Sequence, residues 1–101
     1  MGTLTYDSKI VLNFDDRVLA HLQVVIWSKL RRREPFAFTV VVPAGQGSGR
    51  TSMWMSSNVS LTFQYYSTAR QSLNTIWIDA LIKSANSPTG LQLVEEPVSA
   101  I

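Results

Sequence analysis

The amino-acid sequence predicts an α+β fold in which two helices pack on one face of a mostly antiparallel sheet. The chain has 101 residues, 46% of them apolar, so one α+β domain over residues 1–101 can bury a core without disulfides or a structural metal. Two segments with helical periodicity alternate with short runs of β-branched and aromatic residues. Their order is two strands, a helix, three strands, a helix and a strand (ββαβββαβ), which is typical of α+β proteins.

The first two strands are expected over residues 3–6 and 9–14, which are rich in Val, Ile, Thr and aromatic side chains. Only Asp7-Ser8 separates them, and this short polar step predicts a tight hairpin. One bent strand is the alternative.

The segment from Asp15 to Arg33 is expected to form a helix with one face on the core. Asp15 and Asp16 are the candidate N-caps, and their charges complement the helix dipole. The Glu34-Pro35 step ends the helix, because the residue before proline is driven out of the helical region. The apolar stripe of this helix consists of Leu19, Leu22, Ile26 and Leu30.

Three strands are expected next, over residues 36–42, 50–55 and 60–66. The first is apolar on both faces, which suggests a central position or a sheet covered on both sides. The glycine-rich segment 43–49 is expected to be a mobile hairpin loop, and residues 56–58 a polar turn. Because the connections are short, we expect the three strands to form an antiparallel meander.

A second helix is expected over residues 69–85, where the helical period returns through Leu73, Ile76, Trp77, Ala80 and Leu81. The sequence Asn-Ser-Pro-Thr-Gly at residues 86–90 ends this helix. Residues 91–94 then form the last short strand.

The composition excludes several kinds of chemistry. The chain contains no Cys, which removes thiolate zinc sites, iron–sulfur clusters, thiol nucleophiles and disulfides. The amino terminus is polar and alternating, so no secretory signal is expected, and no apolar run approaches the roughly 18–20 residues that cross a bilayer. We therefore expect a cytoplasmic protein with no membrane partner, no cofactor and no metal.

Three stretches, DDRVLAHLQVVIWSKLRRREPF, GRTSMWM and ANSPTGLQLVEEP, together resemble a family of small, uncharacterised actinobacterial proteins. The resemblance covers nearly the whole chain. Proteins of that family often carry the label ATP-dependent DNA ligase, but a ligase needs a nucleophilic lysine in a K-x-D-G context. Lys9, Lys29 and Lys83 all lack this context. The resemblance thus implies a fold and no catalytic residues. The family pattern usually has Gly where this chain has Arg33.

Four cations at the end of the first helix form the strongest candidate site. Guanidinium and ammonium groups match phosphate oxygens, so we predict that these residues contact the phosphate backbone of DNA or RNA. Arg50, which follows the glycine-rich segment, is a possible helper. The alternative is that the cations only complement the helix dipole and solvate the turn. The cluster consists of Lys29, Arg31, Arg32 and Arg33.

Aromatic residues of the predicted meander offer a second contact with nucleic acid. Trp54, Tyr66 and Tyr65 would form a stacking surface if they lay on an uncovered face of the sheet. Core packing is the alternative, and the sequence does not show which face is open.

Each helix also carries a second apolar line, which predicts a self-association surface centred on Trp27. The alternative is lateral packing of the two helices on the same sheet. The predicted interface consists of Ala20, Val24, Trp27, Ile78 and Ile82.

No residue combination has the pattern of a catalytic site. His21 is expected to point away from the core stripe, because it lies on a different side of the helix from Leu22 and Ile26. No nucleophile lies three or four residues from it, so a surface or capping histidine is expected instead of a catalytic one. The other carboxylates, Asp79, Glu95 and Glu96, are expected to be solvated. We therefore predict a small non-catalytic binding domain, associated either with nucleic acid or with a second copy of the chain.

Overall fold

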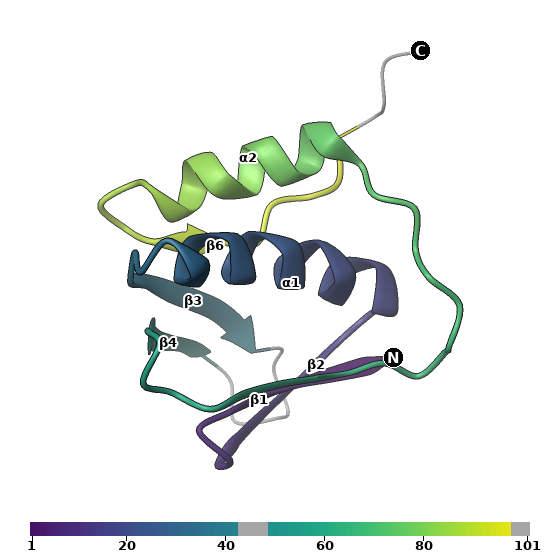
Figure 1. Cartoon of the computed structure of the whole chain (residues 1–101), viewed down its shortest axis with the longest axis horizontal. Coiled ribbons are helices and arrows are strands. Elements are labelled where there is room, and N and C mark those ends of the chain that lie inside the picture. The colour runs from purple at the N-terminus through teal and green to yellow at the C-terminus, as the bar shows by residue number, and fades with distance from the viewer. Residues whose placement is uncertain (43–48, 98–101) are drawn as a thin grey trace.

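The computed structural model describes residues 1–42 and 49–97, which form two helices and two three-stranded sheets (Figure 1). The α+β class and the order ββαβββαβ predicted from the sequence are confirmed. Residues 43–48 of the loop predicted over 43–49 lie outside the described residues, and Gly49 begins β4. The elements are β1 (Gly2–Tyr6), β2 (Ile10–Phe14), α1 (Asp16–Arg31), β3 (Phe36–Val42), β4 (Gly49–Met55), β5 (Leu61–Gln64), α2 (Thr75–Ala85) and β6 (Leu91–Gln92).

The predicted hairpin of β1 and β2 is confirmed. The N–H of Lys9 donates to the carbonyl of Tyr6 at 3.0 Å and closes the turn. Asp7 and Ser8 between them have φ values of 53° and 58°. Two central residues with positive φ form a primed turn, whose twist matches that of the strands it joins.

The predicted meander of β3, β4 and β5 is wrong, because β5 pairs with β1 instead of β4. The two sheets have the strand orders β2-β1-β5 and β4-β3-β6. Leu61 and Phe63 of β5 lie opposite Tyr6 and Leu4, so they extend the apolar face that β1 already presents. Alternation along β5 places these two side chains on one face but does not determine which strand edge they join.

Strand β6 runs parallel to β3, and the chain between the two strands passes through β4, β5 and α2. Gly90 precedes β6 with a φ of 84°. A Cβ at Gly90 would lie 2.5 Å from the carbonyl oxygen of Ala37. Only glycine fits this close approach of the two backbones.

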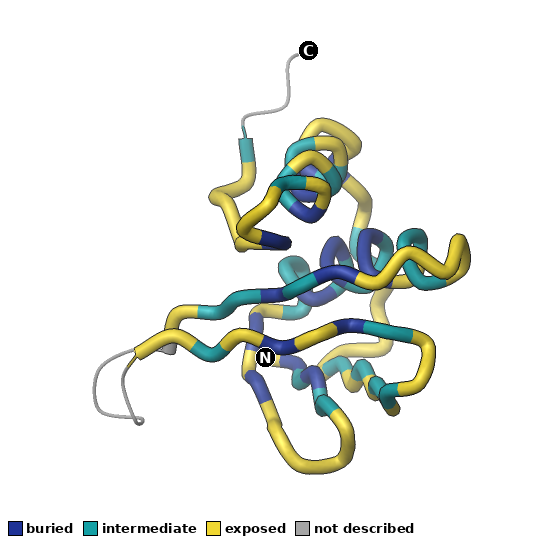
Figure 2. Tube along the Cα trace, turned by 90° about the vertical axis from the view of Figure 1, so that its left-hand side faces the viewer, coloured by how far each residue is buried: buried dark blue, intermediate teal, exposed yellow. Residues whose placement is uncertain are grey.

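Helix α1 contacts β1 and β2, α2 contacts β3 and β6, and the two helices contact each other. Buried positions concentrate where the helices and strands face one another (Figure 2). The buried apolar core consists of Leu4, Leu12, Phe14, Leu19, Leu22, Val25, Ile26, Phe36, Phe38, Met53, Met55, Trp77, Leu81, Ala85 and Leu91. No helix in the described part of the chain is long and apolar enough to cross a membrane.

Helix α2 begins at Thr75, several residues later than the periodicity predicts. Asn74 is the N-cap, and its side-chain oxygen accepts hydrogen bonds from the N–H groups of Ile76 at 3.0 Å and Trp77 at 3.2 Å. Leu73 therefore precedes the helix and is exposed. An Asn directly before an apolar periodic segment is a known start signal, and it locates this boundary better than the period does.

Candidate nucleic-acid interface

The basic cluster lies at the end of α1, where the chain turns into β3. The helix ends at Arg31, Arg32 is the C-cap, and Arg33 has a φ of 58°. The N–H of Glu34 donates to the carbonyl of Lys29 at 3.0 Å, and the N–H of Arg33 to that of Leu30 at 3.0 Å. These two bonds define a Schellman motif with Arg33 at its left-handed position.

The left-handed position of this motif favours glycine, because a Cβ approaches the following carbonyl oxygen there. This chain has Arg33 at that position. Its exposed side chain is therefore carried on a strained backbone.

Lys29 is held inside the protein, unlike the three arginines. Its ammonium group lies 3.1 Å from a carboxylate oxygen of Glu34 and also donates to the side-chain oxygen of Asn86. The Lys29 side chain is only 11% exposed. Because Asn86 is the C-cap of α2, this cation joins the ends of the two helices and has little surface left for a ligand.

Arg31 connects the basic cluster to the predicted interface residue Trp27. The guanidinium carbon of Arg31 lies 5.9 Å from the centre of the Trp27 ring, within the range of a cation–π contact. Trp27 packs edge-on against Phe63 of β5, with ring centres 5.9 Å apart, and stays 42% exposed. The predicted aromatic interface and the predicted basic cluster therefore share one surface.

Arg50 is not part of the cluster. In the β3–β4 register Phe36 lies opposite Met55, whereas Arg50 lies opposite Val41, near the far end of the pair. Five residues of strand separate these positions, or about 16 Å. The structure thus separates the predicted helper from the helix terminus.

The three candidate stacking aromatics have different environments. Trp54 is 58% exposed on β4. Tyr66 is 84% exposed, but its N–H is bound to Asp16 at the other end of α1. Tyr65 packs against the core, and its hydroxyl donates to Gln23. Burial also raises the pKa of Tyr65. Of the three, only Trp54 lies on an open sheet face.

The second apolar line of each helix is partly buried by contacts within the chain. Ala20 and Val24 are half-buried, and Ile78 and Ile82 pack against the core. The contact between α1 and α2 agrees with the lateral packing considered as the alternative. Trp27 is the most exposed residue of the predicted interface.

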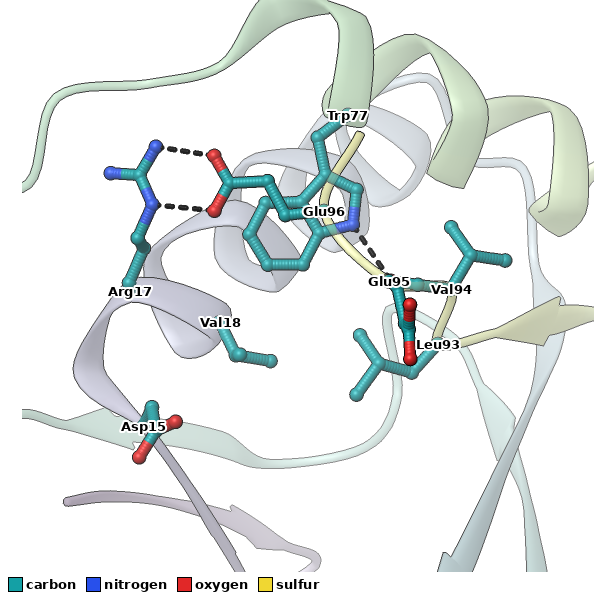
Figure 3. Close-up of a pocket in the computed structure, with 8 residues that line it drawn as sticks. All are labelled: Asp15, Arg17, Val18, Trp77, Leu93, Val94, Glu95 and Glu96. Carbon is teal, nitrogen blue, oxygen red and sulfur yellow. Dashed lines mark hydrogen bonds and ion pairs between the residues drawn. The ribbon is translucent and has the colours of Figure 1, made fainter. Parts of the chain in front are cut away.

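A polar network joins the start of α1 to residues 93–97. Arg17 donates two parallel hydrogen bonds to the Glu96 carboxylate, at 2.7 and 2.6 Å (Figure 3). The side-chain N–H of Asn74 donates to the same carboxylate at 3.0 Å. The hydrogen bonds from Arg17 and Asn74 lower the pKa of Glu96 to about 2. The expectation of a merely solvated Glu96 is wrong, because tertiary contacts bring it to two donors.

An open hollow of about 410 Å³ lies beside this network (Figure 3). The indole N–H of Trp77 donates to the carbonyl of Val94 at 2.9 Å, and Arg17 also donates to the carbonyl of Ser72 at 2.9 Å. Arg17, through Glu96, and Trp77, through the carbonyl of Val94, thus hold the segment after β6 against α1 and α2. Among residues 1–42 and 49–97, no three His, Asp or Glu side chains are placed to hold a metal ion.

His21 is fully buried, so the expectation of a surface histidine is wrong. Its Nε2 accepts a hydrogen bond from the N–H of Asn74 at 2.8 Å, and its Nδ1 lies 2.7 Å from the carbonyl of Arg17. Because Nε2 is an acceptor, Nδ1 carries the proton and donates to Arg17. The ring also packs on Trp77, with centres 4.5 Å apart. Both ring nitrogens are engaged with backbone, so His21 has a structural role.

Asp16 is not the N-cap of α1. Asp15 occupies the N-cap position, but its side chain makes no capping hydrogen bond. The Asp16 carboxylate instead accepts hydrogen bonds from the N–H groups of Ser67 at 2.9 Å and Tyr66 at 3.1 Å. These bonds lower the pKa of Asp16. The side chain thereby fastens the chain after β5 to the start of α1.

A family model matches residues 1–96. No curated protein and no solved structure matches the chain.

Proposed function

The chain belongs to the family described as Domain of unknown function (DUF7882), and we propose that it is a small non-catalytic domain that binds nucleic acid. The contact is made by Arg31, Arg32 and Arg33 with the phosphate backbone. The ligase label of the resembled proteins is not part of this proposal, because the chain has no lysine in a K-x-D-G context.

The observation that carries the proposal is Arg33 at the left-handed position of the Schellman motif, with a φ of 58°. Glycine would be more stable here, so stability alone does not account for a long cationic side chain. Strained backbone is concentrated at functional sites. A guanidinium group on a strained, less stable backbone is expected where the side chain contacts a ligand.

The surroundings of the arginines support phosphate binding. Arg31, Arg32 and Arg33 are exposed, and no carboxylate in the described ranges forms an ion pair with them. The nearest carboxylate along the chain, Glu34, is paired with Lys29. Three adjacent guanidinium groups are therefore available to bind phosphate oxygens.

The test compares two variants that each lose three positive charges. Replacing Arg31, Arg32 and Arg33 with Ser removes the proposed contacts, whereas replacing Lys9, Arg70 and Lys83 with Ser removes exposed cations elsewhere. Binding to labelled mixed-sequence DNA and RNA is measured by fluorescence anisotropy over a range of salt concentrations.

The arginine variant is expected to lose affinity and to reduce the slope of log affinity against log salt by about 2.7 for duplex DNA, at about 0.9 per contact. The control variant is expected to lose much less. Equal losses in both variants, or no binding by the unchanged protein at low salt, would refute the proposal.

A homo-oligomer formed through the outer helix faces is a second candidate, favoured by the 42% exposure of Trp27. Light scattering tests it directly. A dimer at micromolar concentration that dissociates in the Trp27→Glu variant would support this candidate. A monomer whose mass is unchanged by this substitution would eliminate it.

A further inference from the structure

We propose that the outer face of the β4-β3-β6 sheet is a track for single-stranded nucleic acid, with a base stacked on Trp54 and phosphates at Arg33 and Arg50. This inference rests on the proposed function and deepens it. It assigns the ligand class and gives Arg50, which lies apart from the cluster, a place in the same site.

The outer face is defined by alternation along the strands. Phe38 and Met53 point into the core, so their neighbours Thr39 and Ser52 point outward. The hydroxyls of Thr39 and Ser52 lie 2.8 Å apart, which places both side chains on this face. Trp54 and Arg50 lie two residues to either side of Ser52, and hence on the same face.

Trp54 is presented as an open ring. The cross-strand partner of Trp54 is Ala37, and Gly90, just before β6, lies against Ala37. The residues beside Trp54 across the sheet are therefore small and leave its ring uncovered. The Trp54 backbone is held in place because the hydroxyl of Tyr6 donates to its carbonyl at 2.8 Å. A fixed backbone and a 58% exposed indole are what a stacking platform requires.

The charges along the face match a polyanion. Arg50 lies at one end, about 13 Å along β4 from Trp54. At the other end, Arg33 precedes Ala37 by four residues, and Ala37 lies opposite Trp54. The described outward positions of β3, β4 and β6 carry no acidic residue. Glu34, between the cluster and the strand, is neutralised by Lys29 at 3.1 Å.

The geometry favours a single strand over a duplex. A base can stack on Trp54 only when it is not stacked inside a helix. One of the hydroxyls of Thr39 and Ser52 donates to the other, so the pair offers one free donor, together with acceptor lone pairs, to the edge of a splayed base. The ring, the hydroxyl pair and the two flanking cations thus combine the stacking and backbone contacts that single-strand-binding surfaces use.

The experiment uses the full chain and labelled oligonucleotides of about 12 nucleotides, within the range that small single-strand-binding domains cover. The variant is Trp54→Leu, and the matched control is Tyr66→Leu, which removes an exposed aromatic at the far end of α1. Affinities for single strands and for the corresponding duplex are measured by anisotropy. Thermal unfolding confirms that both variants stay folded.

Trp54→Leu is expected to weaken single-strand binding about tenfold or more and to leave duplex binding unchanged. Tyr66→Leu is expected to leave both unchanged. Arg50→Ser is expected to lower the single-strand salt slope by about 0.7.

Three results would overturn the track. If Trp54→Leu binds single strands as well as the unchanged chain does, while the triple arginine variant loses binding, then the proposed function stands and the track fails. If Trp54→Leu instead converts a dimer to a monomer in the absence of nucleic acid, the face is an interface between copies. Failure of the unchanged protein to bind any nucleic acid removes the proposed function and the track together.

Discussion

Replacing Arg33 with Gly should stabilise the protein while weakening nucleic-acid binding. Arg33 has a φ of 58°, in the left-handed region. This conformation costs an L-residue about 1–2 kcal/mol, and the larger entropy that Gly loses on folding offsets about 0.5–1 kcal/mol of the gain. The net gain is therefore about 0–1.5 kcal/mol, centred on about 0.75 kcal/mol, which for a domain of this size raises Tm by about 3–6 °C.

The matched control is Arg33→Ala, which removes the same charge and keeps the strain. Urea unfolding of the two variants and the unchanged chain isolates the backbone contribution. In a helix interior Gly is less stable than Ala by about 0.5–1 kcal/mol, so a reversed order at residue 33 would identify the left-handed position. The reasoning is refuted if Arg33→Gly is no more stable than Arg33→Ala. Both variants should lower the duplex salt slope by about 0.9, since both lose one phosphate contact.

Three further predictions concern the contacts that hold the helices and strands together. Asn74→Ala should lower the free energy of unfolding by about 1 kcal/mol or more in urea titrations, because the α2 N-cap bonds are lost; an unchanged midpoint would contradict this assignment. The pKa of Glu96 is about 2 in the folded protein, against an ordinary value of 4.5, so the contribution of Glu96 to stability is complete above pH 4.5 and is lost as the pH falls toward 2. Glu96→Gln should therefore remove this part of the acid dependence of Tm. An identical pH dependence of Tm in the variant would show that Glu96 does not cause it. Gly90→Ala should destabilise the protein, because its φ is 84° and its Cβ would lie 2.5 Å from the Ala37 carbonyl oxygen; a thermal melt with an unchanged or higher Tm would count against the close approach of β6 to β3.

Local patterns in the sequence determined the elements themselves. Periodicity, the Glu34-Pro35 step and the Asp7-Ser8 turn act over a few residues, so α1, β3 and the first hairpin were predicted nearly to their observed bounds. The order ββαβββαβ and the α+β class followed from those elements. The cations at the end of α1 were also visible in the sequence, because a charge cluster is a property of adjacent residues.

Only the tertiary structure decided which of these elements meet. The partner of β5, the burial of His21 under Trp77 and the binding of Glu96 by Arg17 all depend on residues far apart in the chain. The same is true of the candidate site. Lys29 is bound by Glu34 and Asn86, and Arg31 lies against the ring of Trp27. Arg50 lies on strand β4, far from the end of the helix. Side-chain chemistry is set by composition, but its availability to a ligand is set by packing, which a single sequence does not specify.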